Sequence, residues 1–142
     1  MRPVALQHAE ASNCVFYPGV FNETLGLLFE AHSYFQENGV EEQALMPAHS
    51  RLFYASEMSR VTMRLTSIMA WLMVQKAVHA RRISEEEAIE RYKLEAKEEC
   101  LQHNASHMEH LPYYIGYLSN RSHSLYARVA RLEAMIEDRI YH

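Results

Sequence analysis

Glycine, proline and β-branched residues are scarce in this sequence. Only four glycines and four prolines occur among 142 residues, and valine, isoleucine and threonine together number 17. Rossmann folds and TIM barrels are therefore excluded, because both need valine- and isoleucine-rich strands and glycine turns. The glycines, at positions 19, 26, 39 and 116, are too widely spaced to form a phosphate-binding loop.

Cysteine pairs, basic clusters and long apolar runs are missing as well. The two cysteines, Cys14 and Cys100, cannot build a disulfide framework. The most apolar run, Ile68 to Val74, falls far short of the roughly 20 residues of a membrane span, and no signal-peptide core is present. The net charge of -4, without a block of like charges, argues against a dedicated nucleic-acid binder. We therefore expect a cytoplasmic protein with reduced thiols.

Residues that favour helices dominate what remains. Of the 18 acidic residues 17 are glutamate, and alanine, leucine, arginine and methionine also favour helices. The composition predicts an all-α protein, which we expect to be an antiparallel bundle of three to four helices with one long central helix. The length suits one domain over residues 20–142. It follows an N-terminal tail, residues 1–19, which we expect to pack on the body through Val15, Phe16 and Tyr17.

Caps and helix breakers place four helices along the chain. Asparagine and serine are good N-caps, proline suits a first helical turn, and glycine suits a left-handed C-cap. The Ser84–Glu87 segment also matches a capping box. The predicted helices span Asn22 to Asn38–Gly39, about Pro47 to Arg82, Ser84 through Cys100, and Pro112 onward.

Apolar spacing predicts the inner faces of the last two helices. In the third helix the inner stripe is Ile89, Tyr92, Ala96 and Cys100. The fourth follows a heptad seam, which Gly116 or Ser119–Asn120 could divide into two pieces. The seam consists of Leu111, Ile115, Leu118, Ser122, Leu125, Val129, Leu132 and Ile136.

Motifs of known catalytic chemistry are absent from the sequence. No glutamate is followed three places later by histidine, which argues against a di-iron bundle. Cys100 lies beside Glu98 and Glu99, a setting that disfavours a thiolate nucleophile. We therefore predict a protein that is not an enzyme and has no cofactor.

A histidine cluster leaves a metal-binding sensor or enzyme as an alternative. His103, His107 and His110 follow Glu99 and Cys100 at spacings of three and four, so several could share one helix face and hold a metal. The competing interpretation is a polar helix end with solvated histidines.

Arginines in the fourth helix leave a second alternative. They could form a docking face for nucleic acid or for an acidic protein, or a solvated face that pairs with glutamates. These arginines are Arg121, Arg128, Arg131 and Arg139.

Some tyrosines and apolar residues exceed what one small core can bury, and they predict contacts between chains. Tyr113, Tyr114 and Tyr117 cannot all face one core, so Tyr113 and Tyr117 are candidate interface residues. The second half of the long helix is apolar all round, which indicates a buried central helix or a subunit interface. We therefore predict a homodimer. Small hydroxyl residues of this helix would let a neighbour approach closely; they are Ser56, Ser59, Thr62, Thr66 and Ser67.

Four segments carry a resemblance to a known family. They are VFNETLGLLFEAHSYF (20–35), YASEMSRVTMRLTSIMAWLMVQKAV (54–78), ISEEEA (83–88) and SLYARVARLEAMI (124–136). In length and order these segments resemble the RcdA (regulator of CtrA degradation) family of alphaproteobacterial ClpXP protease adaptors. The resemblance covers about residues 15–137.

The resemblance implies a cytoplasmic helical-bundle homodimer that acts in regulated proteolysis during the bacterial cell cycle. The implied partners are the AAA+ protease ClpXP with a receiver-domain protein, a cyclic-di-GMP effector protein, and substrates such as CtrA. Within the matching run, each polar residue either joins an internal network or contacts a partner. The candidate partner-binding residues there are Ser56, Arg60, Arg64, Trp71 and Gln75.

Overall fold

The computed structural model describes residues 17–103 and 105–142, and the side chains of residues 105–107 lie outside the description. In these residues the chain is all-helical, as predicted, and α3 is the long central helix. The elements are α2 (Pro18–Ala44), α3 (Ala48–His79), α4 (Glu85–Arg91), α5 (Lys97–Leu101), the 3-10 helix η1 (Ala105–His110) and α6 (Tyr113–Tyr141).

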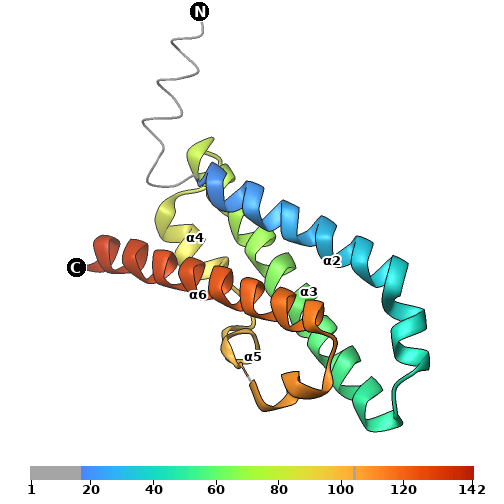
Figure 1. Cartoon of the computed structure of the whole chain (residues 1–142). Helices are drawn as coiled ribbons and strands as arrows, with labels where there is room; N and C mark the ends of the chain where they lie inside the picture. Colours follow the sequence, from blue (N-terminus) through green and yellow to red (C-terminus); the bar gives the residue numbers. More distant parts are fainter. Residues whose placement is uncertain (1–16, 104) are drawn as a thin grey trace, which may run out of the picture.

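Helices α2, α3 and α6 form the body of the bundle, and α4 and α5 contact α3 and α6 (Figure 1). A short turn joins α2 to α3, and the two helices are antiparallel (Figure 1). Glu30 of α2 accepts a hydrogen bond from Tyr114, near the start of α6. Glu23, seven residues earlier in α2, pairs with Arg121 and Arg128, which lie later in α6. Helix α2 is thus antiparallel to α6 as well. Consequently α3 and α6 run in the same direction, and α4, α5 and η1 return the chain between them.

The core is built around α3 and one face of α6. Leu65, Ile68 and Leu72 of α3 are fully buried, and each such side chain stabilises the fold by about 1.5–3 kcal/mol. The heptad seam of α6 is buried except for the half-buried Leu132, and the helix continues unbroken through Gly116 and Asn120. The predicted seam is therefore confirmed, and the division considered for this helix does not occur.

Helix α2 is longer at both ends than the sequence predicted. It begins at Pro18 instead of Asn22, passes Asn38–Gly39 and ends at Ala44. Gly39 is not left-handed. The ring of Phe35 lies 3.0 Å from where a Cβ would be at Gly39. The glycine therefore makes room for an aromatic ring, and the prediction that it caps the helix is wrong.

The last turn of α2 is held by a contact to α3 that local sequence does not reveal. The hydroxyl groups of Tyr34 and Tyr54 both donate to the carboxylate of Glu42, the latter at 3.1 Å. Burial, and then the hydrogen bond to Glu42, raise the pKa of both tyrosines. This clamp ties the end of α2 to the start of α3.

Residues 84–101 form two short helices, where one continuous helix was predicted. The predicted start is confirmed, because the Ser84 hydroxyl accepts a hydrogen bond from the Glu87 N–H at 3.0 Å. The helix then ends at Arg91. Ala96 adopts a left-handed conformation with φ of 60°, and Tyr92 is 46 % exposed, so the predicted inner stripe breaks between Ile89 and Cys100.

A buried carboxylate of α6 accounts for this break. The backbone N–H of Leu94 donates to Glu133 at 2.6 Å, and Lys97 pairs with the same carboxylate at 2.5 Å. The Glu133 side chain is only 5 % exposed. Because a buried charge must be paired, this long-range contact overrides the local preference for helix.

The turn from α3 to α4 is a Schellman motif without its usual glycine. The N–H of Arg82 donates to the Ala77 carbonyl at 2.9 Å, and the N–H of Arg81 donates to the Val78 carbonyl at 3.0 Å. Arg81 has φ of 63°, at the position where glycine is preferred. The turn therefore carries local backbone strain.

The start of the described chain lies against the body. Tyr17 is half-buried and its ring stacks on Trp71, whereas Val15 and Phe16 lie outside the described residues. Helix α2 thus begins two residues before the domain boundary predicted at residue 20. Within the described residues, no helix is both long and apolar enough to cross a membrane.

Candidate partner-binding surfaces

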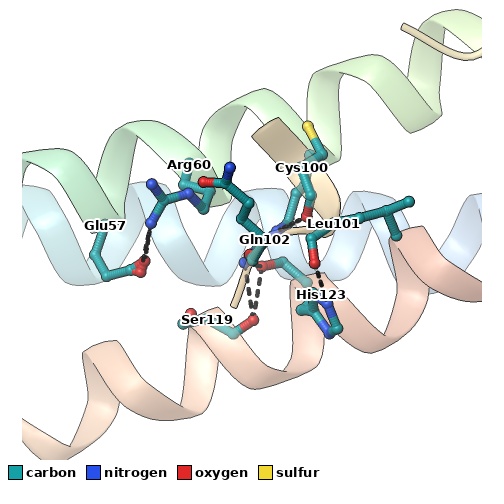
Figure 2. Close-up of polar contacts among 9 residues, drawn as sticks. Glu57, Arg60, Cys100, Leu101, Gln102, Ser119 and His123 are labelled. Atoms are coloured by element: carbon teal, nitrogen blue, oxygen red, sulfur yellow. Dashed lines mark hydrogen bonds and ion pairs between the residues drawn. The ribbon is translucent and has the colours of Figure 1, made fainter. Parts of the chain in front are cut away.

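The guanidinium of Arg64 is the centre of a buried network that joins α3, α5 and α6. Figure 2 labels three of the residues that it contacts, Cys100, Gln102 and Ser119. The Nε and Nη2 atoms of Arg64 donate to the carbonyl oxygens of Cys100 and Gln102 at 2.8 and 2.7 Å. Its Nη1 atom donates to the Ser119 carbonyl and the Ser122 hydroxyl, both at 3.1 Å. Burial lowers the pKa of Arg64, but arginine remains charged in proteins. Arg64 thus fastens the chain around α5 onto the two long helices.

An ion pair lies beside this network on α3. Arg60 pairs with Glu57 at 2.7 Å, with side chains that are 25 % and 4 % exposed. Figure 2 shows this pair on one side of the network and His123 on the other, where its Nε2 atom lies 2.9 Å from the Leu101 carbonyl. Of the two arginines predicted to bind partners, only Arg60 reaches the surface.

A groove without charged residues runs between α2 and α3. Its volume is about 580 Å³, and we call it the α2–α3 groove. A groove of apolar and small polar side chains is typical of a surface that another chain covers. Its lining residues are Leu28, Ala31, His32, Phe35 and Gln43 of α2, with Ala55, Met58, Ser59, Thr62, Met63 and Leu65 of α3.

The exposed face of α3 continues this uncharged surface. Outward faces of helices in soluble proteins are usually polar and charged, but between Arg51 and Lys76 no exposed residue of α3 carries a charge. Most of these side chains are small, so a second helix could approach closely. The exposed residues are Leu52, Ala55, Ser56, Ser59, Thr62, Met63, Thr66, Ala70 and Met73.

A tyrosine cluster marks the first turns of α6. Tyr113 is 90 % exposed, whereas Tyr117 stacks on Tyr114 with centroids 5.2 Å apart. Arg121 donates to the Tyr117 hydroxyl at 3.2 Å. The hydroxyl of Tyr114 donates to Glu30 at 2.6 Å, and this hydrogen bond is the main cause that raises the pKa of Tyr114 to about 12. Of the two candidates here, Tyr113 is open to a partner and Tyr117 is half-buried within the chain.

Two further candidates, Trp71 and Gln75, are buried. Trp71 is 3 % exposed and Gln75 is 5 % exposed, and Tyr17 stacks on Trp71 with centroids 5.9 Å apart. Val74 and Val78 are half-buried. The chain itself thus covers much of the apolar second half of α3, which was predicted to be either a buried central helix or a subunit interface.

The histidines are divided between separate elements. α5 ends at Leu101 and η1 begins at Ala105, so the spacing of a continuous helix does not hold. His103 stacks on His123 with centroids 4.8 Å apart, and burial, then the neighbouring His123, lower the pKa of His103. The side chain of His107 lies outside the described residues. In the part of the chain that the structure describes, no three histidine, cysteine or acidic side chains gather as metal ligands.

Three of the four α6 arginines pair with glutamates of other helices. Arg121 and Arg128 both contact Glu23 of α2, at 3.4 and 2.6 Å, and Arg139 contacts Glu85 of α4 at 2.9 Å. Such pairs help to orient helices although each contributes little to stability. These arginines therefore do not form an open basic face for nucleic acid.

The partner-binding residues predicted on α3 lie on both sides of the helix, and none of them lines the α2–α3 groove, although Ser59 and Thr62, which were expected to let a neighbour approach, do. Ser56 lies on the exposed face of α3, while Phe35 and Met63 line the groove. One signal was present in the sequence: the outward helical positions from Leu52 to Met73 lack charge. That signal could be used only once the buried side of α3 was known.

Comparisons with known proteins place this arrangement in a family. A family model described as "Protein of unknown function (DUF1465)" matches residues 9–141. The chain belongs to this family. No curated protein matches the chain.

A solved structure gives a second likeness. The crystal structure of RcdA from Caulobacter crescentus CB15 matches with a TM-score of 0.64 and 29 % sequence identity. The match covers 82 % of this chain and 87 % of that one. The protein is therefore RcdA-like in sequence and fold, as the four segments predicted.

Proposed function

We propose that this protein is a non-enzymatic adaptor that delivers substrate proteins, such as the cell-cycle regulator CtrA, to the ClpXP protease in the bacterial cytoplasm. The observation that carries the proposal is the likeness to RcdA, which extends over 82 % of this chain at 29 % identity. The two proteins are thus similar in sequence as well as in fold.

An adaptor works by tethering. It binds the protease and a substrate at the same time, which raises the effective concentration of the substrate at the unfoldase without a chemical step. The partners we propose are the ClpXP unfoldase together with a receiver-domain protein, and a cyclic-di-GMP effector protein that helps to engage CtrA. The predicted partner-binding residues that the fold leaves at least partly accessible are Ser56, Arg60, Tyr113 and Tyr117.

The proposal includes a homodimer formed through the α2–α3 groove and the uncharged face of α3. An isologous interface needs a self-complementary patch. A face with no charge from Leu52 to Met73 meets that need, because two copies of it bring no like charges together. Ser59 and Thr62, which line the groove, have small side chains, so two copies of α3 can approach closely.

A binding experiment tests the adaptor role. ClpX is immobilised with the receiver-domain protein, and labelled CtrA is added with the cyclic-di-GMP effector, in the presence or absence of this protein. We expect CtrA to be retained only when this protein is present. Retention that is equal with and without it, or failure of this protein to bind the loaded ClpX, would refute the role.

A further inference from the structure

A second groove lies between the C-terminal half of α3 and the segment that joins α4 to α5. Its volume is about 440 Å³, and we call it the Trp71 groove. Trp71, Val74 and Leu94 give it an apolar wall, and the exposed Ala70 lies at its edge. The other lining residues are Ser67, Glu90, Arg91, Tyr92, Lys93 and Glu95.

The lining of this groove holds two acidic and two basic side chains. Glu90 and Glu95 are acidic. Arg91 and Lys93 are basic, and they also pair with Glu87 and Glu137 outside the lining, at 3.7 and 3.9 Å. A strongly acidic segment would therefore meet two carboxylates beside two cations that are already paired. The groove is suited to a short, uncharged segment with aliphatic and aromatic side chains.

The described chain begins beside Trp71, one of the residues that line this groove. The ring of Tyr17 stacks on Trp71 with an interplanar angle of 19°, at the end of the bundle where α2 begins and α3 ends (Figure 1). The three residues before Tyr17 are Cys14, Val15 and Phe16. An extended chain advances about 3.3–3.6 Å per residue, so these side chains can reach the groove from the Tyr17 anchor.

We propose that the Trp71 groove is a binding site for an uncharged aliphatic–aromatic peptide, and that Val15 and Phe16 of the same chain occupy it. Two observations carry the proposal. The groove presents an apolar wall beside two acidic and two basic side chains. Tyr17, whose ring stacks on Trp71, directly follows the uncharged residues 14–16 in the sequence. Because Tyr17 already fixes one end, docking is intramolecular and occurs at high effective concentration. The proposal does not depend on the adaptor role.

The chain contains the probes for a direct test. Trp71 is its single tryptophan, so all tryptophan emission reports on the wall of the groove. Cys100 is fully buried and burial raises the pKa of its thiol, so a thiol-reactive nitroxide will label Cys14. Nitroxides quench tryptophan only at short range. We expect the emission of the labelled full-length protein to fall to about half or less, because quenching follows the docked fraction.

Two changes should abolish the quenching. The double variant Val15→Ser/Phe16→Ser removes the docking side chains, and Ala70→Glu places a charge at the edge of the groove. Alanine and glutamate are both strong helix formers, so Ala70→Glu should leave α3 intact. Ala134→Glu, at an exposed position of α6, is the matched control and should keep full quenching. Equal quenching in all labelled proteins, or none in the labelled parent, would overturn the proposal.

A mixing experiment separates one chain from two. Labelled Trp71→Phe protein, which has no tryptophan, is mixed with unlabelled parent protein. We expect the emission of the parent to stay unchanged, because its own segment fills its groove. Quenching in this mixture would show that the segment enters a second copy, and would overturn the assignment to the same chain.

Discussion

The buried side chain of Arg64 joins parts of the chain that are distant in the sequence. Its acceptors on Cys100, Gln102, Ser119 and Ser122 lie 36 to 58 residues away. They hold the short helix α5 against the two long helices. This position accounts for a charged residue in the middle of an apolar helix face, since a buried charge is tolerated where its hydrogen bonds are satisfied.

Replacing Arg64 should therefore destabilise the whole fold. Arg64→Met keeps much of the volume but leaves buried carbonyl oxygens without donors. We expect a loss of about 3–5 kcal/mol in the free energy of unfolding, measured by urea denaturation. Arg51→Met, at an exposed arginine that donates to the Met46 carbonyl, is the control and should change stability by less than about 1 kcal/mol. Similar losses in both variants would contradict the central role of Arg64.

The clamp on Glu42 makes stability sensitive to alkaline pH. Burial and Glu42 raise the pKa of Tyr34 and Tyr54 in the folded protein, whereas unfolded tyrosines lose their protons near pH 10. Above about pH 10 the unfolded state therefore binds fewer protons than the folded state, and stability falls as the pH rises. In Tyr54→Phe this fall should be shallower, as measured by urea denaturation between pH 9 and 11. If the free energy of unfolding of Tyr54→Phe falls with pH as steeply as that of the parent protein, the clamp is not the cause of the alkaline loss of stability.

At the scale of elements, helices with continuous local patterns were predictable and their interruptions were not. The heptad of α6 and the Ser84 cap are confirmed by the structure. The end of α2 and the break after Arg91 depend on Glu42 and Glu133, which act through contacts to other helices. Local propensities do not contain this information. They therefore predicted a helix cap at Gly39 and a single helix through Tyr92, and neither is present.

The strained turn after α3 offers a stabilising substitution. Arg81 occupies the left-handed position of the Schellman motif, where a side chain costs about 1–2 kcal/mol. Arg81→Gly should raise the free energy of unfolding by about 0.5–1 kcal/mol, after the greater flexibility of glycine in the unfolded chain is subtracted. Arg82→Gly, one residue further along, should not stabilise the protein. Destabilisation by Arg81→Gly in urea denaturation would refute this account of the turn.

At the scale of the molecule, charge is distributed unevenly between the helices. Glu23 of α2 reaches across to arginines of α6, while the α2–α3 groove and the outer face of α3 carry no charge. The candidate residues on α3 could not be sorted from sequence alone. Ser56 and Arg64 lie two turns apart on one helix, and only the packing of α6 decides which of them faces inward.

This uncharged face is where we expect two chains to meet. The parent protein should have about twice the 16.6 kDa mass of the chain in light scattering. Ser59→Glu places a charge in the α2–α3 groove and should give a folded protein of monomer mass, since unpaired charges disfavour buried interfaces. Ser124→Glu, at an exposed position of α6, should remain a dimer. A monomeric parent, or a dimeric Ser59→Glu variant, would contradict this interface.

The rate at which ClpXP degrades CtrA tests the adaptor role most directly. The receiver-domain protein and the cyclic-di-GMP effector are held constant while the concentration of this protein is varied. We predict that the initial rate rises about tenfold or more and then falls at excess, because a surplus of tethers separates substrate from protease. A rate that stays flat at every concentration, while ClpXP degrades an adaptor-independent substrate normally, would contradict the account.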